Sequence, residues 1–177
     1  IPSMWLLAVV AAIFKKYSRF LPENYRPISL VDTMSKLFVR ILTSRLSDAV
    51  SDRLGPTQFG FRKGWSAMGN IFYILQLAEQ AVQLAEEALV VIFLDLKMRF
   101  DRIRTEELRS ALERIGVHGR LLEMFMKLHE NLKFQVQVSQ YTSKEYYRQR
   151  SLRQGDPAAG ILCIIVLAMV YSDAKKD

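Results

Sequence analysis

The sequence contains very little cysteine and histidine. Its 177 residues include one cysteine, Cys163, and two histidines, His118 and His129. One cysteine excludes an internal disulfide and a zinc site built on several thiolates, and two histidines are too few for a histidine-rich metal site. Cys163 lies in the apolar stretch GILCIIVLAMV, which predicts a small buried side chain.

Long hydrophobic runs, repeats and low-complexity linkers are also missing. The apolar part of IPSMWLLAVVAAIFKK is too short to cross a membrane, and its lysines follow the apolar residues, the reverse of the order in a signal peptide. Hydrophobic residues make up 50% of the chain and charged residues 24%, which indicates one folded domain and not a disordered chain. We therefore expect an intracellular protein without a secretion or transmembrane segment. The lack of an initial methionine and the abrupt end suggest a piece of a longer protein.

Acidic residues are scarce in the first third of the chain. The net charge of the whole chain is +7. Residues 1–65 carry ten Lys and Arg against four Asp and Glu, whereas residues 66–132 carry eight against ten. A basic region of this kind is typical of a surface that binds a polyanion such as a nucleic acid. A solvated basic face without a ligand is the alternative.

Hydrophobic periodicity predicts a mixed α+β fold. The predicted elements are a hairpin of AVVAAIF with RPISL, a helix over 33–50, a loop over 54–64, a helix from Ser66 to about Glu87, a buried strand over 88–95, a helix that Thr105 caps and Gly116 ends, a helix over 119–132, a hairpin of FQVQVS with EYYRQRS, and a helix over 161–172. This order lacks the regular alternation of a doubly wound sheet.

The predicted helices and strands carry apolar stripes that we expect to face the core. These are Met34, Leu37, Ile41, Leu42 and Leu46 on the first helix, Ile71, Leu75, Ala78, Val82 and Ala85 on the second, Leu108, Ala111, Leu112 and Ile115 on the third, and Phe134, Val136 and Val138 on the late strand.

A carboxylate ends the run predicted as the buried strand. In VIFLDLKMRFD (91–101), Asp95 follows apolar, β-branched and aromatic residues. Burying a lone charge is costly, so Asp95 must contact a cation, a hydrogen-bond network or water. One role for this carboxylate is to cap the turn that follows the strand.

Three short clusters flank this aspartate: NYRPISL (24–30), QFGFRKG (58–64) and RQGDP (153–157). Each alone is ordinary turn chemistry. In this order, with FLDLKMRFD (93–101) between the second and the third, they resemble the reverse transcriptase of non-LTR (LINE-type) retrotransposons. The resemblance covers nearly the whole chain, because IPSMWLLAVVAAIFKK also fits the opening of that family.

The resemblance implies the fingers (about 1–87) and part of the palm with motif B (about 88–177) of a right-hand polymerase, truncated before the Tyr-x-Asp-Asp hairpin. It implies DNA synthesis on an RNA template, from a DNA primer and deoxynucleoside triphosphates, by two-metal nucleotidyl transfer with Mg²⁺. The implied site residues are Asp95 as catalytic residue and metal ligand, Lys15, Lys16, Arg26, Phe100, Gln154 and Gly155 at the nucleotide, and Arg62 and Lys63 at the nucleic acid. Phe100 would lie beneath the sugar and select deoxynucleotides.

The chain departs from the family pattern near the implied site. Arg99 replaces a small residue and either fills nucleotide volume or turns to solvent, and AAG follows RQGDP where a Leu-Ser-Pro type sequence is usual. Asp101 and Asp156–Pro157 are interpreted as a cap and a turn, not as ligands. YSDAKKD (171–177) is too close to RQGDP to be the Tyr-x-Asp-Asp hairpin.

Two functions therefore remain open. Two-metal catalysis needs more than one carboxylate, so we expect a polymerase fragment that is inactive in isolation. The alternative is a degenerate or domesticated nucleic-acid-binding relic without polymerase activity. A protein–protein module is disfavoured by the basic residues of 1–65. The oligomeric state does not follow from the sequence.

Overall fold

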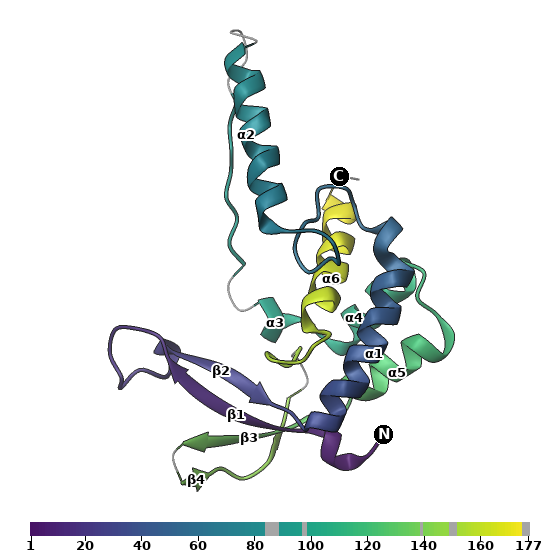
Figure 1. Ribbon diagram of the computed structural model, residues 1–177. Coiled ribbons are helices and arrows are strands. Elements are labelled where there is room, and N and C mark those ends of the chain that lie inside the picture. Colours follow the sequence, from purple (N-terminus) through teal and green to yellow (C-terminus); the bar gives the residue numbers. More distant parts are fainter. Residues whose placement is uncertain (84–88, 97–98, 139, 149–151, 175–177) are drawn as a thin grey trace.

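The computed structural model of the protein describes residues 1–83, 89–96, 99–138, 140–148 and 152–174. It is a mixed α and β structure, as predicted. Its described strands form one sheet, and the helices lie beside it (Figure 1).

The sheet is built from two segments that are far apart in the sequence, 7–30 and 133–147. Its strands are β1 (Leu7–Phe14), β2 (Tyr25–Leu30), β3 (Lys133–Val138), β4 (Tyr141–Thr142) and β5 (Tyr146–Tyr147). The predicted N-terminal hairpin is confirmed, because β1 pairs antiparallel with β2. β1 also pairs parallel with β3, against which β4 and β5 run antiparallel. Phe134 is buried as predicted, but Val138 is exposed at the end of β3.

The predicted helices are confirmed, with small shifts at their ends. They are α1 (Thr33–Val50), α2 (Ala67–Gln83), a short α3 (Arg99–Arg102), α4 (Thr105–Arg114), α5 (Gly119–His129) and α6 (Ala159–Ala174), with 3-10 helices η1 (Ser3–Leu6), η2 (Pro22–Asn24) and η3 (Ser51–Arg53). Thr105 is the first helical residue and not the cap. The Glu107 carboxylate accepts the backbone N–H of Arg104 at 3.0 Å, so the cap lies one residue earlier.

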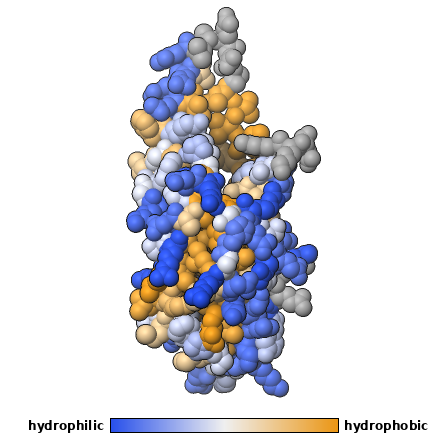
Figure 2. Space-filling model, turned by 90° about the vertical axis from the view of Figure 1, so that its right-hand side faces the viewer, coloured by the Kyte–Doolittle hydropathy of each residue, from blue (hydrophilic) through white to orange (hydrophobic). Residues whose placement is uncertain are grey.

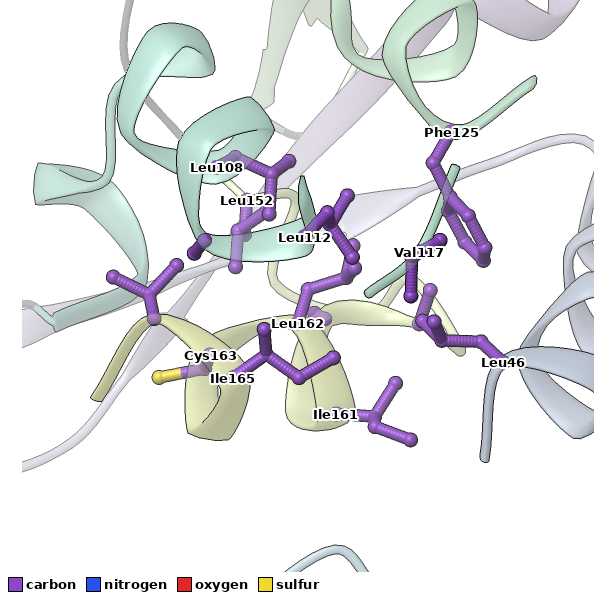
Figure 3. Close-up of a cluster of buried hydrophobic side chains, with 14 of the residues drawn as sticks. Leu46, Leu108, Leu112, Val117, Phe125, Leu152, Ile161, Leu162, Cys163 and Ile165 are labelled. Atoms are coloured by element: carbon purple, nitrogen blue, oxygen red, sulfur yellow. The ribbon is translucent and has the colours of Figure 1, made fainter. Parts of the chain in front are cut away.

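The main core lies between four helices (Figure 3). It contains Leu46 from α1, Leu108 and Leu112 from α4, Phe125 from α5, and Leu162, Cys163 and Ile165 from α6. Cys163 is buried as predicted. A smaller buried cluster lies at the sheet. It contains Ala8 and Val10 from β1, Phe134 from β3, and the residues next to the strands, Val31 and Leu132.

The predicted inner face of α1 is partly wrong. Leu42 and Leu46 are buried, but Met34, Leu37 and Ile41 are exposed and Val39 is buried instead. The helix has more apolar residues than one face can bury, and the stripe of Val39, Leu42, Leu46 and Val50 is the one that meets the core.

α2 and the segment that follows it project away from the other helices (Figure 1). The predicted inner stripe of α2 is wrong because none of its described residues is buried; Ala85 and Glu87 lie outside the described residues. The predicted buried strand is also wrong. Residues 89–96 have no regular secondary structure and run back beside α2, with Phe93 84% and Ile92 76% exposed.

The reason is that an apolar strand is buried only when other strands and side chains cover it. The described strands pair with one another and not with 89–96. Apolar side chains of α2 and of 89–96 are consequently exposed on the surface of the molecule (Figure 2).

Candidate nucleotide and nucleic-acid site

The far end of the β1–β2 hairpin carries three of the predicted site residues. Arg26 on β2 lies opposite Ile13 on β1. Lys15 and Lys16 follow β1 directly, and the backbone N–H of Lys15 donates to the Asn24 carbonyl at 2.8 Å. All three basic side chains are exposed. The hairpin thus presents them on neighbouring positions at one end, where a phosphate could reach them.

The RQGDP segment forms a turn held by a buried ion pair. Arg153 Nη2 lies 3.0 Å from Asp156 Oδ2, and both side chains are at most 1% exposed. Arg153 Nη1 donates to the Trp5 carbonyl at 2.9 Å, and Asp156 Oδ1 accepts the backbone N–H of Ala158 at 2.9 Å. The predicted turn role of Asp156 is therefore confirmed, and the partner of its carboxylate is Arg153.

This turn lies against the edge strand of the sheet. The backbone N–H of Ser29 in β2 donates to the Gln154 carbonyl at 2.8 Å. Gly155 has φ +112°, and a Cβ placed on it would lie 2.7 Å from the Ser29 carbonyl oxygen. Glycine is required at position 155 for two reasons: a side chain would clash with the backbone of β2, and the positive φ is unfavourable for residues with a Cβ. Ser29 is three residues from Arg26, so the structure brings NYRPISL and RQGDP together.

Phe100 joins this region through the backbone. It lies in α3, and its carbonyl accepts the N–H of Leu152 at 2.8 Å, just before the turn. Its ring is half-buried and packs against the main core. The ring of Phe100 therefore contributes to the core, as its apolar character alone predicts.

Asp95 does not form a metal centre with other described residues. It is exposed in the segment 89–96, and the described parts of the chain contain no group of three or more His, Cys, Asp or Glu side chains that could bind a metal ion. The resemblance implies a two-metal site, but one exposed carboxylate does not form such a site by itself. The side chains of Arg99 and Asp101 lie outside what the structure describes.

Arg62 and Lys63 lie in the loop between η3 and α2, away from the hairpin. The Arg62 guanidinium donates to the carbonyls of Ser51, Gly55 and Gln58 at 2.8, 3.0 and 3.3 Å. It also lies 4.2 Å from the centre of the Trp65 ring. These contacts hold the loop in shape. The Lys63 side chain is exposed.

A buried histidine lies near the ion pair. His129 Nδ1 is 2.8 Å from the Phe125 carbonyl, so this nitrogen carries the proton. Burial lowers the pKa of His129 below its usual value, and the neighbouring Asp156 opposes part of this effect. Burial likewise lowers the pKa of Arg153. Burial thus favours the neutral imidazole, and the Asp156 carboxylate pairs with Arg153.

Sequence reasoning missed Arg153 and Ser29. The string RQGD places an arginine three residues before an aspartate, which is compatible with an ion pair. Nothing in the sequence shows that both side chains are buried or that the turn between them contacts β2.

The described helices include none that is both long and apolar enough to cross a membrane.

Comparison with known proteins identifies the family. The family described as reverse transcriptase (RNA-dependent DNA polymerase) matches residues 13–177. The chain therefore belongs to the reverse transcriptase family, which implies the fold of a reverse-transcriptase polymerase.

Its relatives are polymerases of non-LTR retrotransposons. The chain is 29% identical to the probable RNA-directed DNA polymerase from transposon BS of Drosophila melanogaster, over 97% of this chain and 19% of that protein. It is 28% identical to the Pol polyprotein of the type-1 retrotransposable element R2 of Popillia japonica, over 94% and 23%. A polymerase from the mobile element jockey of Drosophila funebris is 25% identical, over 75% and 14%. The LINE-type resemblance is confirmed, and the chain spans between 14% and 23% of the length of these relatives.

Proposed function

We propose that this chain is the nucleotide-binding part of an RNA-directed DNA polymerase of a non-LTR retrotransposon. Such an enzyme copies an RNA template by adding deoxynucleoside triphosphates to a DNA primer. The observation that carries the proposal is the hydrogen bond from Ser29 to Gln154, which places the strand of Arg26 beside the Gln154–Gly155 turn. Residues of about 1–87 would be the fingers and about 88–177 part of the palm.

The hairpin and the turn have different proposed roles. Lys15, Lys16 and Arg26 would bind phosphate oxygens, with Arg26 able to make a paired, charge-assisted contact. Gln154 and Gly155 would lie against the nucleotide. Phe100 would lie beneath the sugar, and its contact with the core would keep the ring in place.

Two further residues are proposed to act at other positions. Lys63 would contact the backbone of the nucleic acid, while Arg62 keeps the loop that carries Lys63 in shape through its three carbonyl contacts. Asp95 would be one Mg²⁺ ligand in a polymerase that contains further carboxylates. The chain by itself then binds nucleotide and nucleic acid without completing the reaction.

The proposal can be tested by binding measurements on the purified chain. A fluorescent single-stranded RNA and a fluorescent (N-methylanthraniloyl) deoxyadenosine triphosphate are titrated with the wild type, with Arg26→Ala and with the double variant Lys15→Ala/Lys16→Ala. RNA affinity is measured between about 50 and about 200 mM salt, where each lost phosphate contact lowers the slope of log K against log salt by about 0.7. We expect both variants to lose nucleotide affinity and the double variant to lose salt dependence.

The matched control is Arg120→Ala/Lys127→Ala, which removes two exposed basic residues from α5 and leaves the hairpin unchanged. It should bind like the wild type. RNA binding without nucleotide binding would favour the nucleic-acid-binding relic. Equal losses in the control and in the hairpin variants would mean that only the net charge matters, and the assignment of the hairpin would be wrong.

A further inference from the structure

We propose that Arg153 and Asp156 are positioning residues that hold the Gln154–Gly155 turn against the edge of β2. The proposal depends on the proposed function only for its effect on nucleotide binding. The position of the turn against β2, and so of the β1–β2 hairpin against the helical core, does not depend on that function.

Arg153 connects parts of the chain that are far apart in sequence. Its guanidinium contacts the Trp5 carbonyl in η1 through Nη1 and Asp156 through Nη2. The Asp156 carboxylate in turn accepts the N–H of Ala158, immediately before α6. Together, the Arg153–Asp156 ion pair and the hydrogen bonds of its two members connect η1, which directly precedes β1, with the start of the core helix α6.

The turn between the two charged residues has little freedom. The N–H of Asp156 donates to the Arg153 carbonyl at 3.0 Å and closes the turn. Within it, the Gln154 carbonyl accepts the Ser29 N–H, and Gly155 lies too close to Ser29 to accept a side chain. Because both terminal nitrogens of Arg153, Nη1 and Nη2, have fixed acceptors, the place where the turn meets β2 is fixed as well.

Stability alone does not explain a charged pair at this place. Desolvating two charges is costly, and well-packed apolar residues of similar volume are often equally stable or more so. The pair does provide direction, because the guanidinium and the carboxylate bond in a defined geometry. A preformed arrangement of Arg26, Gln154 and Gly155 would lower the cost of ordering them around a nucleotide.

The test is amide hydrogen exchange on the full 177-residue chain, read at Ser29 and at the core residues Phe125 and Leu162. Arg153→Met removes the guanidinium, and Arg153→Met/Asp156→Asn also removes the charge that would otherwise stay unpaired, while Asn keeps an oxygen for the Ala158 N–H. We expect exchange at Ser29 to rise at least about tenfold in both variants, with the core amides within about twofold of the wild type. Arg153→Lys, which can reach one acceptor, should restore part of the protection.

The matched control is Arg114→Met. Arg114 makes a bidentate ion pair with Asp173 between α4 and α6, at 2.6 and 2.8 Å, on the surface and away from the turn. Its loss removes a guanidinium of the same kind and should leave exchange at Ser29 unchanged.

Nucleotide affinity separates positioning from general support. With the fluorescent deoxyadenosine triphosphate, the double variant should bind at least about fivefold more weakly, equivalent to about 1 kcal/mol, while its affinity for RNA at the lysines is retained. Unchanged exchange at Ser29 and unchanged nucleotide affinity in the double variant would overturn the proposal. Equal loss of protection at Ser29 and in the core would reduce the pair to general structural support. If the wild type binds no nucleotide, the proposed function fails, and exchange at Ser29 still decides the geometric part.

Discussion

Replacing Gly155 by alanine tests the contact between the turn and β2 most directly. The new methyl group would lie 2.7 Å from the Ser29 carbonyl oxygen, which is backbone and cannot rotate away. The φ of +112° adds strain, because a residue with a Cβ rarely adopts it. Backbone strain of this kind costs about 1–3 kcal/mol, and relief of the contact requires the turn to move from β2. We expect Gly155→Ala to lower the free energy of unfolding, measured in urea, by about 3 kcal/mol in total.

A second glycine separates the two causes. Gly119 has φ +62°, and a Cβ on it would have no neighbour within 4 Å. Gly119→Ala therefore carries the cost of backbone strain without the contact, about 1–2 kcal/mol. The two variants are compared by urea unfolding and by exchange at Ser29, which only Gly155→Ala should raise. Equal costs and equal exchange in the two variants would refute the argument that the turn lies against β2.

Two further predictions concern His129 and the segment 89–96. Because burial lowers the pKa of His129 in the folded state, the unfolded chain takes up a proton first as the pH falls below about 6.5. The contribution of His129 to the free energy of unfolding is therefore fully present above that pH. It decreases as the pH falls from there to the lower pKa of the folded state, by at most about 1.4 kcal/mol per pH unit. Urea unfolding from about pH 7.5 to about pH 5.5 should show this loss in the wild type and a smaller one in His129→Asn; the same pH dependence in both would contradict the role of His129. Phe93→Ser changes a side chain that is 84% exposed, so it should change stability by no more than about 0.5 kcal/mol and reduce self-association in sedimentation experiments. A loss of about 3 kcal/mol or more would indicate that Phe93 is buried in a core.

Several elements could be predicted from the sequence because local rules decide them. The helix over 33–50 has apolar residues at helical spacing and an aspartate before it whose side chain accepts the Ser35 N–H at 3.0 Å. The β1–β2 hairpin follows from two β-rich runs separated by a polar connection. Gly116, with φ +84°, ends the helix where expected. Family membership was also readable, since the order of short clusters along a chain is a property of the sequence.

Whether an apolar element is buried could not be predicted from the sequence in the same way. The run over 88–95 is apolar enough for a covered strand, but coverage depends on which other strands are near, and the described sheet leaves 89–96 outside it. The same holds for α2, whose apolar stripe contacts no core. Periodicity states which face of an element can be buried, and the neighbouring elements decide whether it is.

The candidate site divides in the same way. The chemical groups of the site can be read from the amino-acid sequence: basic residues at 15, 16 and 26, a carboxylate at 95, and a glycine turn at 154–155. Which of these groups lie close together depends on the packing of the folded chain. Ser29 and Gln154 are joined by one backbone hydrogen bond across more than a hundred residues, and the guanidinium of Arg153 is buried because Trp5 and Asp156 supply its acceptors. Such contacts depend on how distant segments pack, and a charged side chain remains buried only where that packing provides a partner.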